Sequence, residues 1–147
     1  MIVFDLDSTL ADTRHRRKHL PVDPKTGADW IDYHLHCEHD DLLDTVTLID
    51  LLADIHEIVI VSARPDTPEV REATVNWLAK REIEYSHLIL KPLDMPLRDT
   101  AAWKAAMVAD LPSVALFVDD WAPNCEAVAR LGVPTICVRA PEGSVAG

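Results

Sequence analysis

Two carboxylates, Asp5 and Asp7, stand two residues apart directly after a short apolar run at residues 1–4. A buried strand ends where charged residues begin, so we expect Asp5 at the carboxyl end of a strand, where open α/β sheets bind ligands. A carboxylate attacks a phosphate only when a cation screens their repulsion, so the pair predicts phosphoryl transfer assisted by a metal ion. The alternative interpretation is a strand followed by a turn that an aspartate side chain caps.

Further residues that could take part in phosphoryl transfer occur later in the chain, most of them directly after apolar segments. Two adjacent acids at the end of an apolar strand are costly to bury without a cation, which favours a functional role for the last pair. The groups are Ser62 and Arg64 after residues 57–61, Lys104 in the helical pattern of residues 99–107, and Asp119 and Asp120 after residues 114–118.

Strands alternate with helical patterns along the whole chain, which is typical of a parallel sheet built from βαβ units. A hydroxyl cap, a proline and an acid at Thr67, Pro68 and Glu69 predict one helix start, and Gly132 predicts the end of the last helix. The tail, residues 141–147, has turn composition and is expected to fray. The expected strands are 1–4, 57–62, 87–91, 114–118 and 134–138, and the expected helices are 44–54, 67–83, 99–107 and 123–131.

An acid pair, a serine, a lysine and a second acid pair in this order resemble the four motifs of the haloacid dehalogenase-like (HAD) phosphohydrolases, over residues 2–138. Within that superfamily the chain is particularly similar to the 3′-phosphatase domain of bacteriophage polynucleotide kinase. The shared motifs are Asp-x-Asp-x-Thr-Leu-Ala at 5–11, Val-Ser-x-Arg at 61–64, Trp-Lys at 103–104 and Asp-Asp at 119–120. The resemblance implies an α/β fold, a three-layer Rossmann-like doubly wound parallel sheet, in one domain of residues 1–147. Ser8 stands where glycine is frequent in the family, which we expect to be sterically mild.

The resemblance also implies a role for each motif residue. Asp5 would be the nucleophile that forms an aspartyl-phosphate, and Asp7 the general acid and later the base for water. Thr9 and Ser62 would offer hydroxyls to phosphate oxygens, and Lys104 would neutralise those oxygens. The alternatives are backbone capping for the two hydroxyls and a solvated charge on a helix for the lysine.

Mg²⁺ is the cofactor that the resemblance implies. Its expected ligands are Asp5, the backbone carbonyl of Asp7, and Asp119, with Asp120 as an outer or alternative ligand. Asn124 stands where some members of the superfamily have another acid, which leaves the outer metal ligands open.

Residues 13–43 do not fit the alternation of strands and helices, and they lie where the superfamily inserts its cap. About thirty residues are too few for a large helical cap, so the resemblance implies a nearly open site with a small lid. This segment contains residue types that bind zinc, but their spacing matches no standard zinc motif, so we expect a solvated polar loop and no zinc. The residues concerned are His34, His36, Cys37, Glu38, His39, Asp40 and Asp41.

A local basic cluster follows the first motif in a chain whose net charge is −11. Arg14, Arg16, Arg17 and Lys18 are four of its fourteen Lys and Arg residues. The overall acidity argues against a broad nucleic-acid-coating surface, whereas the cluster indicates a funnel for a polyanion. We expect Arg14, Arg17 and Arg64 to contact the substrate; the alternative is a charged face exposed to solvent.

The composition excludes several other classes of protein. No apolar run approaches the roughly 18 residues that cross a bilayer, and the N-terminus has no basic leader, so no membrane partner is expected. Three widely spaced cysteines indicate neither a disulfide framework nor a cysteine-based zinc site, and we expect a cytoplasmic protein. The sequence has no Gly-x-x-x-x-Gly-Lys loop, which excludes P-loop kinase chemistry within these residues.

The sequence therefore predicts a Mg²⁺-dependent phosphomonoesterase, with a nucleic-acid 3′-phosphate end as the first-choice substrate. One alternative is a nucleotidase that hydrolyses nucleoside monophosphates. Another is a catalytically idle HAD-like interaction module, which the intact acids at all motif positions disfavour. The first two hypotheses differ in whether residues 13–43 close over the site, and the sequence leaves both this and the oligomeric state open.

Overall fold

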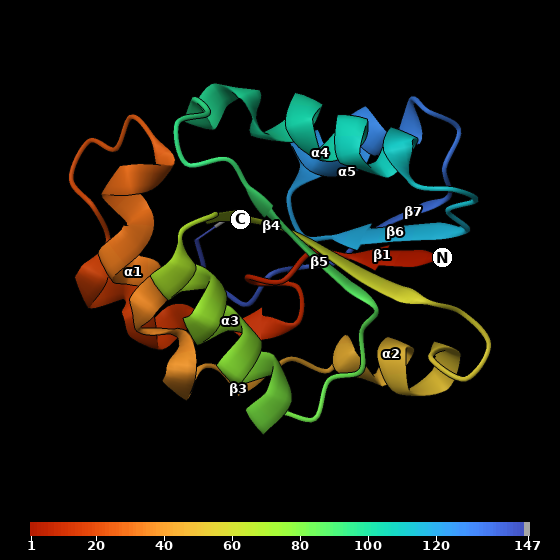
Figure 1. The fold of residues 1–147 in the computed structure, drawn as a ribbon, viewed down its shortest axis with the longest axis horizontal. Helices are drawn as coiled ribbons and strands as arrows, with labels where there is room; N and C mark the ends of the chain where they lie inside the picture. The colour runs from red at the N-terminus through yellow and green to blue at the C-terminus, as the bar shows by residue number, and fades with distance from the viewer. Residues whose placement is uncertain (146–147) are drawn as a thin grey trace.

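A five-stranded sheet forms the centre of the protein in the computed structural model, which describes residues 1–145. Its strands lie in the order β5-β4-β1-β6-β7, and all neighbouring pairs are parallel (Figure 1). The strands are β1 (Ile2–Phe4), β4 (Ile58–Pro65), β5 (His87–Lys91), β6 (Leu116–Asp119) and β7 (Thr135–Cys137).

Helices cover both faces of this sheet. In Figure 1, α2 (Val46–Leu52) and α3 (Pro68–Lys80) lie below it, and α4 (Thr100–Asp110) and α5 (Ala122–Ala129) lie above it. The chain adds β4 and β5 on one side of β1 and then returns to add β6 and β7 on the other side. The predicted doubly wound parallel sheet is therefore confirmed. Ligands of such folds bind at the carboxyl ends of the strands where the order reverses, which here is beside β1.

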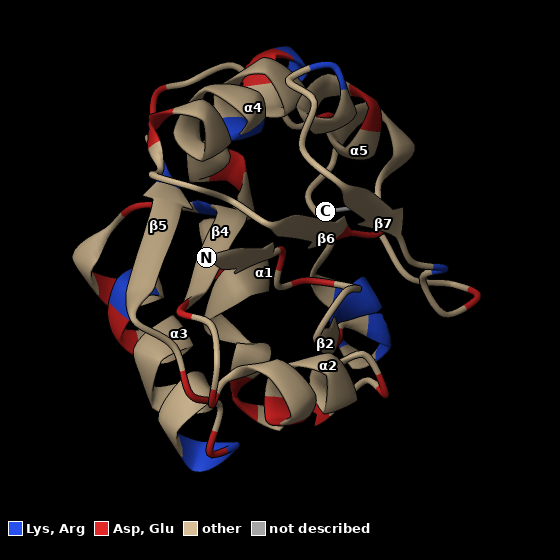
Figure 2. Ribbon diagram, turned by 90° about the vertical axis from the view of Figure 1, so that its right-hand side faces the viewer, with Lys and Arg blue, Asp and Glu red and all other residues tan. Residues whose placement is uncertain are grey.

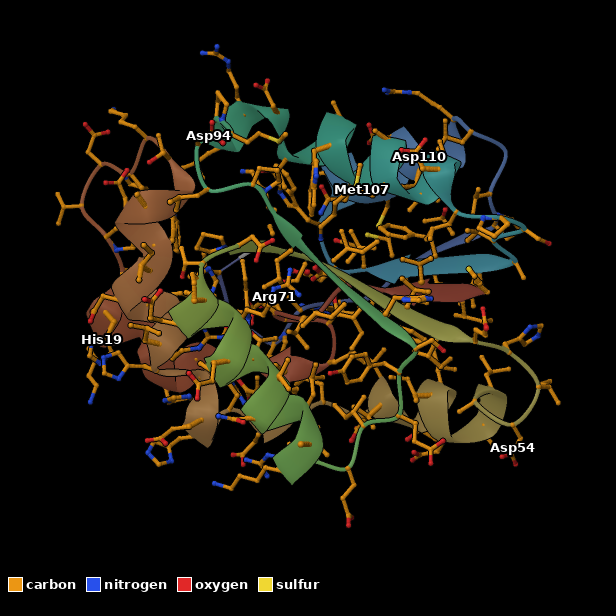
Figure 3. The ribbon with its side chains drawn as sticks, viewed as in Figure 1. His19, Asp54, Arg71, Asp94, Met107 and Asp110 are labelled. Carbon is orange, nitrogen blue, oxygen red and sulfur yellow. The ribbon has the colours of Figure 1, made fainter. Side chains whose placement is uncertain are left out.

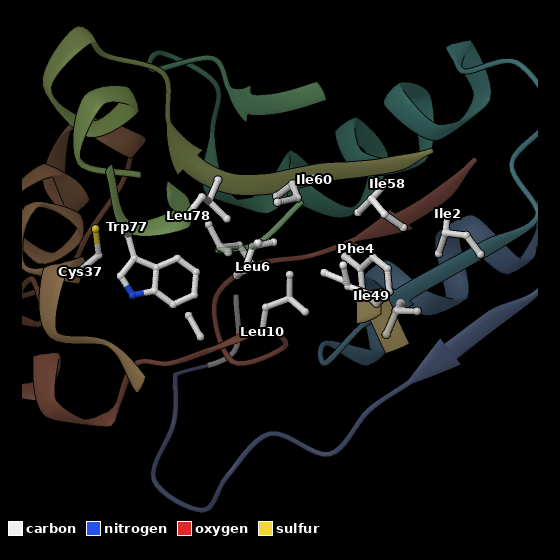
Figure 4. Packing of buried hydrophobic residues seen from close by; sticks show 13 residues of the cluster. Ile2, Phe4, Leu6, Leu10, Cys37, Ile49, Ile58, Ile60, Trp77 and Leu78 are labelled. Carbon is white, nitrogen blue, oxygen red and sulfur yellow. The ribbon is translucent and has the colours of Figure 1, made fainter. Parts of the chain in front are cut away.

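The two hydrophobic layers follow from the two-residue period of the strands. Ile2 and Phe4 pack toward α2 and α3 in one cluster, which Figure 4 shows around Trp77 and Leu10. Val3, the residue between them, packs in the other cluster, toward α4 and α5. The apolar runs of β1, β4 and β6 are thus strands buried on both faces, whereas the edge strands β5 and β7 are partly exposed.

Residues 13–43 form the small cap insertion that we expected, although the stretch from His34 to Asp41 is largely helical and not a polar loop. Antiparallel β2 (Ala11–Asp12) and β3 (Asp41–Leu42) pair at the base of the cap. Between these strands the chain forms short helical segments. Their local hydrogen bonds pair the backbone N–H and C=O groups of a segment that has little apolar periodicity. They are η1 (Arg14–His19), η2 (Gly27–Trp30), α1 (Ile31–Leu35) and η3 (Cys37–His39), of which η1, η2 and η3 are 3₁₀ helices.

Two backbone features differ from expectation. Ser8 has a φ of 64°, in the left-handed region that favours glycine. Its conformation costs about 1 kcal/mol or more, so the serine is not the mild replacement that we expected. The tail was expected to fray, yet the Ser8 hydroxyl donates a hydrogen bond of 2.9 Å to the carbonyl of Val145. The last two residues of that predicted tail lie outside the described residues.

No helix in the described part of the chain is both long and apolar enough to cross a membrane.

Candidate active site

Two carboxylates from neighbouring strands meet at the edge of the sheet beside β1. Asp5 directly follows β1, and Asp119 is the last residue of β6. Phe4 pairs with Val118, and the Asp5 amide donates a hydrogen bond of 2.9 Å to the Val118 carbonyl, so the register places the two acids side by side. Both side chains are buried, with 1% of Asp5 and none of Asp119 exposed.

Lys104 joins these two carboxylates from α4. Its Nζ donates to Asp5 Oδ1 at 2.5 Å and to Asp119 Oδ2 at 2.7 Å, and the residue is fully buried. Burial lowers the pKa of an ammonium group, but the two carboxylates outweigh this effect and raise the pKa of Lys104 above its ordinary value. Lys104 is therefore a charged part of the site, not the solvated helical residue of the alternative interpretation.

Asp120 and Thr9 complete this group. Thr9 Oγ1 lies 3.2 Å from Asp5 Oδ2 and 3.3 Å from Asp120 Oδ1, within donating distance of both oxygens. Asp120 Oδ2 is buried without a hydrogen-bond partner among the described residues. Burial, reinforced by the charge of Asp119, raises the pKa of Asp120 to about 7. We call Asp5, Lys104, Asp119 and Asp120 the floor of the site.

The donor set of the floor fits Mg²⁺. Asp5, Asp119 and Asp120 each offer one carboxylate oxygen, and these atoms all lie within 4.8 Å of one another. Burial raises the pKa of Asp5 well above its ordinary value, and Lys104 offsets only part of this effect. Two buried carboxylates and one half-buried carboxylate, with a single ammonium group, leave negative charge to be neutralised. Mg²⁺ prefers oxygen ligands of this kind. We expected Asp5, Asp7 and Asp119 to converge; Asp5 and Asp119 do so, and the third member is Asp120 instead of the Asp7 carboxylate.

Asn124 orients one of these acids. Its Nδ2 lies 3.1 and 3.0 Å from the two oxygens of Asp119, and the Trp121 amide donates to Asp119 Oδ1 at 2.8 Å. An amide can donate to Asp119, which an ionised acid at position 124 could not do. The departure of Asn124 from the family pattern therefore provides a donor that fixes Asp119.

The carboxylate of Asp7 points away from this group. It accepts hydrogen bonds from Arg64 Nη2 at 2.6 Å and from Arg16 Nη2 at 2.7 Å. Burial by itself would raise the pKa of Asp7, but the two guanidinium groups hold it well below its ordinary value. The Asp7 side chain thus does not join Asp5 and Asp119 in the group of possible metal ligands. A metal contact through the Asp7 backbone carbonyl stays a prediction.

A second carboxylate, Asp40, balances these arginines. It accepts from Arg16 Nε at 2.9 Å and Nη2 at 2.7 Å, and lies 3.6 Å from Arg64 Nη2. The indole of Trp77 in α3 donates to the Asp40 carbonyl at 3.0 Å, so α3 holds this residue in place. We call Asp7, Arg16, Arg64 and Asp40 the roof network.

His34 lies at the edge of the roof network. Its Nδ1 is 3.4 Å from Asp7 Oδ2 and 3.3 Å from Arg16 Nη1. Burial lowers the pKa of His34 to about 3, so the imidazole is neutral at physiological pH.

Of the residues expected to contact substrate, some lie at the cavity and others lie on the surface outside it. Ser62 lines the cavity beside Asp5, and its Oγ accepts from the Arg64 amide at 3.3 Å. Arg64 is fully buried and binds Asp7. Arg14 is exposed and pairs with Asp12 through its Nε at 2.9 Å. Arg17 is also exposed and lies beside Gly143, and neither of these two arginines lines the cavity. Figure 2 shows their basic segment beside β2.

The polar residues 34–41 do not converge on one metal position. His34 and Asp40 turn toward the roof network, whereas His36 stacks on His19 at the outer end of the cap, where Figure 3 labels His19. His19, Asp32 and His36 offer donor atoms within 4.8 Å of one another. The two imidazole rings are, however, stacked at 3.5 Å with 18° between their planes. Ring nitrogens bind a metal in the ring plane, and one ion cannot lie in both of these planes.

A cavity of about 170 Å³ lies between the sheet edge and the cap. Ligand sites for drug-sized molecules have volumes of roughly 300–1,000 Å³, so a large substrate can enter only by one end. The cap supplies one wall, including Trp30 and Tyr33, so residues 13–43 cover the site more fully than the nearly open arrangement that we expected. The opposite walls include Asp5, Asp7, Ser62, Lys91, Thr100 and Trp121.

Sequence analysis missed the functional placement of Arg16, Asp40 and Lys91. In a 3₁₀ helix every third residue shares a face, and this period groups Arg16 with buried Thr13. Lys91 ends β5 at the same sheet edge as Asp5, a position that could have identified it. Asp40 had no local signal, because only the packing of the cap against α3 places it.

Comparisons with known proteins bear on the fold. Neither a scan against models of protein families nor a search of curated proteins finds a match. Among solved structures, a chain of the Pnkp1/Rnl/Hen1 RNA repair complex matches with a TM-score of 0.75 at 19% identity, over 96% of this chain and 42% of that one. A second structure of the Pnkp1/Rnl/Hen1 complex gives the same TM-score and identity, with 46% of that chain covered. This chain thus spans less than half the length of these matching chains.

A third match is a haloacid dehalogenase-like family hydrolase from Streptococcus pneumoniae, with a TM-score of 0.60 at 15% identity, over 92% of this chain and 82% of that one. The expectation of a HAD-like fold is confirmed. At such identities the likeness extends to the fold alone.

Proposed function

We propose that this protein is a Mg²⁺-dependent phosphomonoesterase that removes the 3′-phosphate from a nucleic-acid end. The observation that carries the proposal is the floor, where Lys104 and two further carboxylates surround the buried carboxylate of Asp5 at the sheet edge. Asp5, Asp119 and Asp120 would hold Mg²⁺, which supplies positive charge to the oxygens of the phosphoryl group.

Each residue of the chain has a defined part in this reaction. Asp5 attacks phosphorus and forms an aspartyl-phosphate as the bond to the leaving oxygen breaks. Lys104 keeps Asp5 in place and neutralises charge on the transferred oxygens. Asp7 donates a proton to the leaving oxygen and later accepts one from the attacking water. Arg16 and Arg64 fix the Asp7 carboxylate and favour its ionised form, which is the form that accepts the proton from water. For the first step Asp7 has to take up a proton from solvent before it can donate that proton to the leaving oxygen.

Three observations support the end of a nucleic-acid strand as the substrate. The cavity admits only a small part of a large molecule. Basic residues Arg14, Arg17 and Lys18 are exposed on η1, the segment whose Arg16 contacts Asp7, and could bind the rest of a nucleic-acid strand. Two of the matching structures contain Pnkp1/Rnl/Hen1, of which one is described as an RNA repair complex.

The alternative is a nucleotidase that acts on free nucleoside monophosphates. The cap favours it, because Trp30, Tyr33 and His34 close over the cavity and could enclose a small substrate.

Phosphate release from matched substrates distinguishes the two functions. We expect faster release from an oligonucleotide with a 3′-phosphate than from the same oligonucleotide with a 5′-phosphate or from nucleoside monophosphates, in the presence of Mg²⁺. EDTA should stop release and Mg²⁺ should restore it, with the Asp5→Asn protein as the blank. Preference for free mononucleotides would establish the alternative, and activity that survives thorough chelation would contradict the metal site.

A further inference from the structure

Lys91 is a buried cation in the wall of the cavity that contains Asp5. It is the last residue of β5, and only 1% of it is exposed. Its Nζ donates to Thr100 Oγ1 at 2.8 Å, and the Thr100 hydroxyl donates to the Leu97 carbonyl at 2.7 Å. Among residues 1–145, this hydroxyl is the one acceptor that the structure gives to the Lys91 ammonium group.

The other buried cations of the site are already neutralised. Lys104 binds two carboxylates, and Arg16 and Arg64 share Asp7 and Asp40. Within the described residues, no carboxylate lies within ion-pair distance of Lys91. Burial removes hydration from this ammonium group, and the hydroxyl of Thr100, with Asp99 beyond ion-pair distance, compensates only part of that loss. Lys91 can therefore bind an anion that enters the cavity.

The position of Lys91 separates it from the reacting phosphoryl group. Its partner Thr100 lies four residues before Lys104, one turn away on the same face of α4. Residues with this spacing are about 5–6 Å apart between their Cβ atoms. Lys104 contacts Asp5, so Lys91 lies about one helical turn farther along the cavity wall. The N-terminal end of α4, which includes Thr100, adds partial positive charge there.

We propose that Lys91 binds a second phosphate of the substrate, on the 5′ side of the terminal nucleoside. In a strand this group is the phosphodiester that precedes the terminal nucleoside, and in a small molecule it is the 5′-phosphate of a nucleoside 3′,5′-bisphosphate. The inference rests on the proposed 3′-phosphatase function. It defines the minimal good substrate as a 3′-phosphorylated nucleoside that carries another phosphate on its 5′ side.

Three substrates test this inference: a nucleoside 3′-monophosphate, the corresponding 3′,5′-bisphosphate, and a dinucleotide with a 3′-phosphate. Hydrogen bonds to charged groups contribute enough that the wild-type KM should be roughly 10-fold or more lower for the two substrates with a second phosphate. In Lys91→Met this ratio of KM values should fall to about 1, with kcat values that stay similar for the three substrates. Lys91→Arg should keep most of the ratio, since it keeps the charge. Lys80→Met, at an exposed lysine at the end of α3, is the matched control and should retain the wild-type ratio.

The outcomes separate the two proposals. A bisphosphate preferred over the dinucleotide would identify a small-molecule source of the second phosphate, and the reverse would identify a strand. Release from all three substrates with equal wild-type KM values would overturn the role of Lys91 alone, and this measurement needs no variant. An equal rise of KM for all three substrates in Lys91→Met would also overturn it, because Lys91 would then contact the transferred group. No release from any 3′-phosphorylated substrate would overturn the proposed function itself.

Discussion

The floor and the roof network are both buried ionic groups, but their charges balance differently. The floor has three carboxylates, Asp5, Asp119 and Asp120, and one cation, Lys104. The roof network has two carboxylates, Asp7 and Asp40, and two guanidinium groups. The floor therefore needs a cation from outside the chain, whereas the roof network is complete without one. This difference supports our proposal that the floor holds the metal ion and carries the reaction, and that the roof network fixes Asp7.

Removal of the floor nucleophile should have the largest effect on activity. Asp5→Asn cannot form an aspartyl-phosphate, and loss of a catalytic nucleophile lowers kcat by roughly 10⁴–10⁶-fold. Unfolding by urea should show that stability without Mg²⁺ is not reduced, because the variant removes surplus negative charge. Substantial turnover by folded Asp5→Asn would exclude the assignment.

Replacement of the acid held by the roof network should have a smaller and more selective effect. General acid catalysis contributes about 10²–10⁴-fold, so Asp7→Asn should lose that much with a sugar phosphate, whose leaving group is poor. The loss should be smaller with an aryl phosphate, whose leaving group needs little protonation. Steady-state rates with both substrates make the comparison, and equal losses would contradict the acid role.

The charge balance of the roof network predicts that loss of one arginine from it lowers the free energy of unfolding strongly. Arg64→Met leaves the buried Asp7 and Asp40 with one arginine, and the loss of one partner from a buried ion pair costs about 3–5 kcal/mol. Arg14→Met is the matched control, since it breaks an exposed pair with Asp12 that solvent screens, and it should cost far less stability. Urea denaturation measures both values. Similar losses for the two variants would mean that the roof network does not depend on its charge balance.

Mg²⁺ should stabilise the protein through the floor. Ligand at 100 times its Kd adds about 2.7 kcal/mol to the free energy of unfolding, and thermal unfolding with and without Mg²⁺ measures this. Asp120→Asn should reduce the shift in Tm. Asp7→Asn should retain it, because its carboxylate lies outside the floor and the variant keeps the backbone carbonyl. A Tm that does not change in millimolar Mg²⁺ would count against the metal site.

The exposed basic residues should have the smallest effect. The triple variant Arg14→Ala, Arg17→Ala, Lys18→Ala should raise KM for a 3′-phosphorylated oligonucleotide several-fold relative to an aryl phosphate. Each lost phosphate contact also removes roughly 0.7 from the log–log salt dependence for a single strand. Arg16 is left intact, because it belongs to the roof network. A variant that affects both substrates alike would show that the cluster is only a solvated face.

The floor was easier to predict from the sequence than the roof network, for a physical reason. Asp5 and Asp119 end apolar strands, and the parallel sheet brings such strand ends together, so local patterns were sufficient. The orientation of Asp7 depends on Arg16 and Arg64, which are 9 and 57 residues away in sequence. The three-residue period that groups Arg16 with Thr13 is informative only once the segment is known to be a 3₁₀ helix, which the sequence did not indicate. Contacts between the cap and α3 decide which arginine turns inward, and they exist only in the folded chain.

The bond between Ser8 and Val145 has a practical consequence for recombinant protein. Val145 lines the cavity, so a label or cross-linker attached at position 145 would lie beside Asp5. Met1 lies at the other end of β1, where its ammonium group donates to the carbonyl of Ser113. A label attached at Met1 would therefore stay clear of substrate, whereas one attached at position 145 would obstruct entry and depress measured activity.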